Sequence, residues 1–117
     1  MPREKIATWP SAQASRVTVG ASESLSGNRV ISVAEIEVNQ AFIFNPGATA
    51  RNVDLPAAAA CAGVMVFIGN AGTTTGTLTI RDAAAATIDT IAAPAANNLT
   101  GALLFCTGAA WFGLVVG

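Results

Sequence analysis

Apolar residues occupy both faces of several strands that this sequence predicts. In the stretch Gly63–Gly69, Val66 and Ile68 fall on one face of a strand, while Met65 and Phe67 fall on the other. A two-layer domain of 117 residues has one interior, which covers only one face of each sheet. The second apolar face therefore needs a cover, and another chain is the simplest one. The same two-faced pattern occurs in Ala41–Asn45, Gly101–Thr107 and Ala110–Val116.

Short β-branched and apolar runs, separated by turn residues, predict an all-β fold. Asn45-Pro46-Gly47 and the glycine-rich segment Gly69–Gly76 are strong turn signals, because Pro fixes φ and Gly allows a positive φ. Turns at such short spacing are typical of sandwiches and barrels. We predict a small antiparallel β-sandwich or jelly-roll-like module, one domain over residues 15–117, completed by oligomerisation. The expected strands are Ser15–Val19, Val30–Val38, Ala41–Asn45, Arg51–Leu55, Gly63–Gly69, Gly76–Arg81, Thr87–Ile91, Gly101–Thr107 and Ala110–Val116.

Two features of the composition compete with this interpretation. Alanine runs favour helix, but Pro56 and Pro94 interrupt two of them, so we expect single helical turns or tight loops at most. The chain is 52% hydrophobic and 11% charged, which fits either a membrane segment or a surface covered by other subunits. The longest uncharged stretch, Leu99–Gly117, contains four glycines, and no Lys or Arg follows Arg81 to anchor it. We therefore expect covered surfaces and no membrane partner.

Residues 1–14 contain two prolines and no hydrophobic periodicity, which predicts an extended N-terminal arm. Because a buried aromatic side chain contributes much of the energy of an interface, an arm that keeps a tryptophan is a candidate for partner contact. We expect Arg3, Lys5, Ile6 and Trp9 to make that contact. A Trp9 side chain folded back on its own domain is the alternative.

The residue types that enzymes rely on are sparse. The chain has no His, and its Ser and Cys residues have no neighbouring base, so we expect no catalysis, no metal and no cofactor. Glu35 and Glu37 would share one face of a strand, where a solvated surface is a better interpretation than a catalytic pair. Cys61 and Cys106 are expected as free thiols, with a disulfide as the alternative. The net charge of −1 gives no footprint for nucleic acid.

The order of elements in residues 51–117 resembles small phage virion proteins, namely trimeric head-decoration (cement) and fibre modules. The resemblance rests on Leu55-Pro56 before an alanine stretch, on a glycine-flanked strand that ends in Asn70, and on a Trp after a glycine near the chain's end. It implies a trimeric β-sandwich or jelly-roll-like module that stabilises or ornaments a capsid. The matching segments are Asn52–Pro56, Gly63–Gly72, Leu78–Asp82, Ile88–Ile91 and Leu104–Gly108 followed by Trp111.

From these observations we expect a structural virion protein rather than an enzyme. The first hypothesis is a capsid decoration protein that binds the assembled phage head as a homotrimer, with the major capsid protein as its partner and no small-molecule substrate. The sequence has no apolar run behind its N-terminal charges that would predict a signal peptide, so we expect synthesis in the host cytoplasm and a final place on the capsid surface. The alternative is a fibre or tail receptor-binding module. The residues expected to pack between subunits are Met65, Phe67, Phe112 and Leu114.

Overall fold

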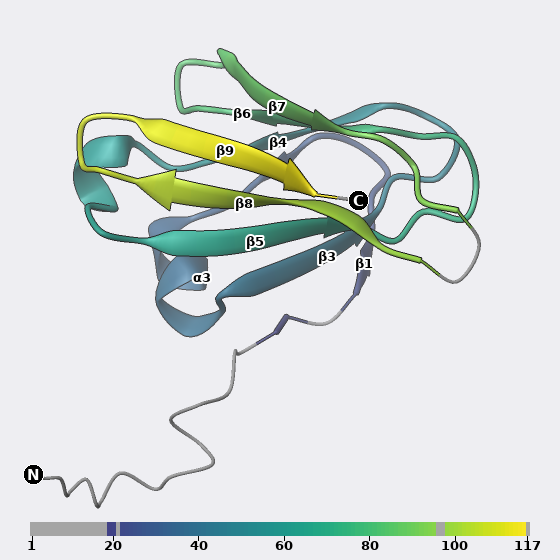
Figure 1. The fold of residues 1–117 in the computed structure, drawn as a ribbon, viewed down its shortest axis with the longest axis horizontal. Helices are drawn as coiled ribbons and strands as arrows, with labels where there is room; N and C mark the ends of the chain where they lie inside the picture. Colours follow the sequence, from purple (N-terminus) through teal and green to yellow (C-terminus); the bar gives the residue numbers. More distant parts are fainter. Residues whose placement is uncertain (1–18, 21, 96–97, 117) are drawn as a thin grey trace, which may run out of the picture.

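The computed structural model describes residues 19–20, 22–95 and 98–116. Within these residues, the chain is mostly β-sheet, with two mixed sheets and one short α-helix, which confirms the predicted β-rich class (Figure 1). The residues expected to form the arm lie outside the described part. The elements are β1 (Glu23–Ser24), β2 (Arg29–Val30), α3 (Val33–Val38), β3 (Ala41–Asn45), β4 (Arg51–Asp54), η1 (Ala58–Ala60), β5 (Met65–Asn70), β6 (Leu78–Arg81), β7 (Thr87–Ile91), β8 (Thr100–Cys106) and β9 (Trp111–Val116).

The first six strands pass alternately from one sheet to the other. The five-stranded sheet has the order β1-β3-β5-β8-β9, and the four-stranded sheet has the order β2-β4-β6-β7. A strand that returns to its sheet after crossing the other one runs in the original direction, so β1, β3 and β5 are parallel, as are β2, β4 and β6. The strands therefore form three coils, β1–β2, β3–β4 and β5–β6. Only β7, β8 and β9 add antiparallel pairs, and the prediction of an antiparallel sandwich was wrong in this respect.

The same side-chain hydrogen bond, from an Asn to the Gly two residues later, marks the point where the chain leaves the five-stranded sheet in two successive coils. At the end of β3, Asn45 Oδ1 accepts a hydrogen bond of 2.9 Å from Gly47 N–H, and Gly47 has a φ of 72°. At the end of β5, Asn70 Oδ1 accepts one of 2.8 Å from Gly72 N–H. Asn70 is fully buried, and its Nδ2 donates to the Gly76 carbonyl at 3.1 Å. These Asn-x-Gly turns fix the points at which the chain changes sheets.

The predicted strand Val30–Val38 is wrong, because most of it is helix. Strand β2 ends at Val30, and α3 begins after Ser32, whose Oγ accepts a hydrogen bond from Glu35 N–H at 3.2 Å. The Glu35 carboxylate in turn accepts one from Ser32 N–H at 2.9 Å, which completes a capping box. This reciprocal cap, together with the burial of Ile36 against the core, outweighs the β-branched residues of the segment.

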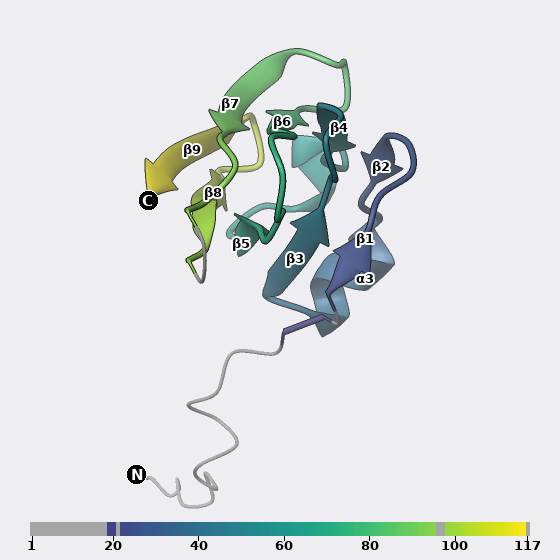
Figure 2. The same ribbon diagram turned by 90° about the vertical axis from the view of Figure 1, so that its right-hand side faces the viewer.

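A single hydrophobic core lies between the two sheets, which stack as layers when the molecule is seen end-on (Figure 2). Most inward side chains of both sheets are buried, and Trp111 donates its indole N–H to the Pro56 carbonyl at 2.9 Å. Cys61 and Cys106 are buried free thiols within this core. The core also includes Phe42, Phe44, Val53, Leu55, Val66, Ile68, Leu78, Ile80, Ile91, Ala102 and Leu104.

The alanine runs form single turns and loops, as predicted. Ala58–Ala60 is one turn of 3₁₀-helix, and the run 83–86 forms the β6–β7 turn, in which Ala85 has a φ of 66°. Of the expected strand Ser15–Val19, only Val19 is described, and it forms an isolated parallel bridge with Ala41. In the part of the chain that the structure describes, no helix combines the length and the apolar character needed to cross a bilayer.

Candidate functional site

The outer face of the five-stranded sheet carries a row of large apolar side chains in register. Met65 pairs with Phe105, and Phe105 pairs with Phe112, so that the three side chains lie side by side across β5, β8 and β9. They are 52%, 40% and 58% exposed, respectively. Their strand neighbours Val66, Leu104 and Trp111 point the other way, into the core. The row is therefore apolar surface that the described part of the chain leaves uncovered.

A second row of apolar side chains and a glycine beneath one of them extend this surface. Phe67 pairs with Leu103, and Leu103 pairs with Leu114, which is 54% exposed. The Phe67 ring lies over Gly101 and leaves no room there for a Cβ atom. Glycine on a strand usually marks such a close approach, and here an aromatic ring covers it. We define the apolar face by its residues, namely Met65, Phe67, Leu103, Phe105, Phe112, Leu114 and Val116.

The outer face of the four-stranded sheet is polar by contrast. Arg81 and Asp54 are cross-strand neighbours, and the guanidinium donates to both carboxylate oxygens at 2.7 and 2.9 Å. These hydrogen bonds raise the pKa of Arg81. A row of Asn52, Thr79 and Thr90 lies beside this pair. The two outer faces therefore differ in character, one suited to water and the other to an apolar partner.

All four residues predicted to pack between subunits lie on the apolar face. Met65, Phe67, Phe112 and Leu114 come from two strands that are separated by β8, and the sheet brings them together. Leu103 and Phe105 of β8 lie on the same face, although they were not among the expected contact residues. Arg3, Lys5, Ile6 and Trp9, the expected arm contacts, lie outside the described residues.

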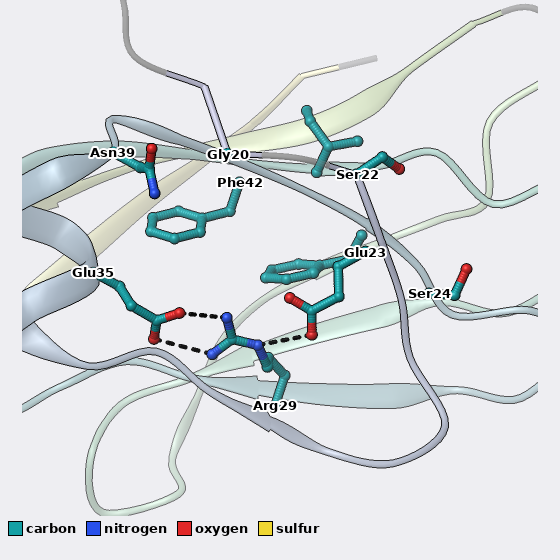
Figure 3. A pocket seen from close by; sticks show the side chains of 10 residues that line it. Gly20, Ser22, Glu23, Ser24, Arg29, Glu35, Asn39 and Phe42 are labelled. Carbon is teal, nitrogen blue, oxygen red and sulfur yellow. Dashed lines mark hydrogen bonds and ion pairs between the residues drawn. The ribbon is translucent and has the colours of Figure 1, made fainter.

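A pocket of about 510 Å³ opens beside α3 and β1, with Arg29 at its centre (Figure 3). The Arg29 guanidinium donates to Glu23 at 2.9 Å and to both carboxylate oxygens of Glu35, and it lies 5.7 Å from the centre of the Phe44 ring. The hydrogen bond from Arg29 is the largest cause that lowers the pKa of Glu35 to about 2. Because Arg29 is already committed to two carboxylates, this cluster joins α3 to the first coil and leaves little charge for an anionic ligand.

Glu35 and Glu37 do not form the shared strand face that the sequence predicted. Glu35 binds Arg29 and caps α3, whereas Glu37 is exposed on the helix. Burial is the main cause that raises the pKa of the Cys61 thiol, so this group stays protonated and is a poor nucleophile near neutral pH. Within residues 19–20, 22–95 and 98–116, no three Cys, Asp or Glu residues cluster as metal ligands would.

The apolar face is thus the candidate functional site, and its side chains are of the kind that pack against an apolar partner. Its strands present their large side chains outward in aligned rows, without a charged group among them. Obligate protein interfaces have this composition. No protein-family model matches the chain, and neither a curated protein nor a solved structure matches it.

Proposed function

We propose that this chain is a structural virion protein, a capsid decoration protein that binds the assembled phage head as a homotrimer and stabilises it. The observation that supports self-association is the contrast between the apolar face and the polar face on the opposite sheet. The virion setting and the number of three come from the resemblance of residues 51–117 to head-decoration modules.

The size of the apolar face supports a partner. Its five most exposed side chains are between 40% and 58% exposed, which leaves on the order of 400 Å² of apolar surface if each large side chain presents roughly 150–200 Å². The largest patches on monomers reach about 300–600 Å² and are often functional. Burying one large apolar side chain contributes about 1.5–3 kcal/mol, so several of them together favour association strongly.

The mechanism of stabilisation is thermodynamic. A protein that binds only the assembled shell shifts the equilibrium toward the shell, by an amount that grows with its concentration relative to its Kd. In this proposal the major capsid protein is the partner, and the arm residues Arg3, Lys5, Ile6 and Trp9 reach it. The module has no catalytic role and lies on the capsid surface.

The test combines subunit number with particle binding. Light scattering of the purified chain at micromolar concentration is expected to give an oligomer, and Phe112→Ser is expected to weaken it, because Phe112 is the most exposed aromatic side chain of the face. Thr90→Ala on the polar face is the matched control and should leave the mass unchanged. A monomer with a cooperative melt would refute self-association.

The capsid assignment has its own readout. The oligomer is mixed with undecorated phage heads, and its occupancy is measured by co-sedimentation. Saturable binding with an increased melting temperature of the heads is the expected result, and Trp9→Ala should reduce occupancy. An oligomer that does not bind phage heads but binds host cells would favour the fibre or tail receptor-binding module instead.

A further inference from the structure

Strand β9 is a sheet edge without the usual protection. Proteins blunt their edge strands by making them short, by placing charges on them or by bulges. The edges β1 and β2 have two residues each and carry Glu23 and Arg29. The edge β7 carries Asp89 and follows a bulge in its pairing with β6. Strand β9 has six residues, Trp111–Val116, and contains neither a charge nor a proline.

The backbone groups along the free side of β9 can be assigned from the ladder. The Cys106 N–H donates to the Val64 carbonyl, and the Cys106 carbonyl accepts from the Gly63 N–H, at 2.9 Å each. Both backbone groups of Cys106 therefore point toward the β5 side. Along an antiparallel strand, the backbone N–H and C=O groups of successive residues point alternately to one side and the other. The backbone groups of Phe105 and Leu103 therefore point toward β9 and form hydrogen bonds with those of Phe112 and Leu114. The backbone groups of Trp111, Gly113 and Val115 therefore point away from β8.

The neighbouring strand β7 does not pair with this edge. It belongs to the other sheet, and no ladder joins it to β9. The Asp89 carboxylate of β7 stands against Gly113, since a Cβ atom on Gly113 would collide with its Oδ2. Side-chain contact between these strands thus replaces backbone pairing. Among residues 19–20, 22–95 and 98–116, no strand pairs with the free side of β9.

We propose that β9 pairs with β9 of a second copy of this chain, antiparallel, so that the five-stranded sheet continues across a two-fold axis. Within the described residues, β9 is the long edge strand without protection, so the best matching edge in a self-associating protein is another β9. The pairing would also continue the apolar face from one copy to the next, because Phe112 and Leu114 belong to both features. It adds contact area to a face that alone provides about half of the roughly 800 Å² per partner of a standard interface.

This pairing rests on the proposed self-association but not on the number of three. A two-fold contact requires an even number of subunits. If the apolar faces also pack around a three-fold axis, as the resemblance implies, the two contacts together give six copies.

Amide hydrogen exchange is the direct test. In the wild-type oligomer, the N–H groups of Gly113 and Val115 should exchange at least tenfold more slowly than in the dissociated chain, since pairing would bond them. Val115→Pro removes one of these donors without touching the ladder to β8, and the dissociation constant should rise by about tenfold or more. Val115→Lys places a charge on the edge at a residue that is 43% exposed and should act in the same direction.

The control and the outcomes separate this inference from the proposed function. Leu114→Pro removes an N–H that is bonded to β8, so it should disrupt the β8–β9 hairpin itself. The contrast with Val115→Pro would show that the N–H groups of Leu114 and Val115 point to opposite sides of β9. An oligomer of three copies that Phe112→Ser dissociates, with fast exchange at Gly113 and Val115 and no effect of Val115→Lys, would overturn β9 pairing and leave the proposed function standing. A monomeric wild type would overturn both.

Discussion

Replacement of Glu35 by Gln tests the ion pair that joins α3 to the first coil. The Glu35 carboxylate accepts hydrogen bonds from Arg29 and from Ser32 N–H, and these interactions lower its pKa from 4.5 to about 2, with Arg29 as the largest cause. A carboxylate with a lower pKa in the folded state stabilises the fold above its unfolded pKa and loses this contribution as the pH falls through the folded value. The stabilisation should therefore be complete near pH 7 and disappear between about pH 4.5 and pH 2.

The magnitude follows from the shift and from the exposure of the side chain. At about 1.4 kcal/mol per pKa unit, the shift corresponds to about 3 kcal/mol before solvent is considered. The Glu35 side chain is 34% exposed, and water screens such a pair, so we expect Glu35→Gln to lower the free energy of unfolding by about 1–1.5 kcal/mol at pH 7. Gln retains an acceptor for Ser32 N–H, so part of the cap survives.

Urea unfolding at fixed protein concentration, repeated from pH 7 to below pH 2, measures this effect. Glu37→Gln is the matched control on the same helix, and it should change stability by less than about 0.5 kcal/mol because Glu37 is exposed. The difference between the wild type and Glu35→Gln should shrink toward zero at the acid end. Equal losses in the two variants, or a difference that does not depend on pH, would refute the ion pair as its source.

Two further predictions concern single backbone positions. Ala85→Gly should raise the free energy of unfolding by about 0.5–1 kcal/mol, because Gly accepts the positive φ of Ala85 without strain. The control Ala84→Gly should not stabilise the chain, and thermal melts of the two variants measure the difference. Gly113→Ala should lower the free energy of unfolding by about 1–3 kcal/mol, since its Cβ would collide with the Asp89 carboxylate. In a double-mutant cycle, adding Asp89→Ala should recover part of that loss, and additive losses would count against the contact.

The strands after residue 40 could be predicted from the sequence, because their β-branched runs lie between strong turn signals. Ala41–Asn45 and Thr87–Ile91 match the observed β3 and β7, and most other boundaries differ by one or two residues. The helix α3 was missed although Ser32 and Glu35 have the spacing of a capping box, a signal that was available. The β-branched residues around it favoured strand, and the burial of Ile36 against the core, which adds to the cap in favour of helix, is not visible in the sequence.

The directions of the strands could not be predicted from the alternation of their side chains. Whether β3 lies parallel or antiparallel to β5 depends on the path of the connection through the other sheet, which side-chain alternation does not report. The repeated Asn-x-Gly turns at Asn45 and Asn70 were a clue to successive coils. The apolar face was predictable, because alternation assigns each side chain to a face whatever the direction of its strand. The ion pairs of Arg29 were not, since they join residues of different elements.

The coil path also has a consequence for the order in which the chain folds. The hairpins β6–β7 and β8–β9 join residues that are close in the sequence, whereas the parallel pairs join residues at least 21 positions apart, as Glu23 and Phe44 are. Closing longer loops costs more chain entropy, and contacts of high sequence separation form more slowly. The hairpins, including β8 and β9 of the apolar face, are therefore expected to form before the first coil closes. During that interval part of the apolar face is formed before the rest of the fold. Newly made copies could then associate through it before β1 and β2 join their sheets.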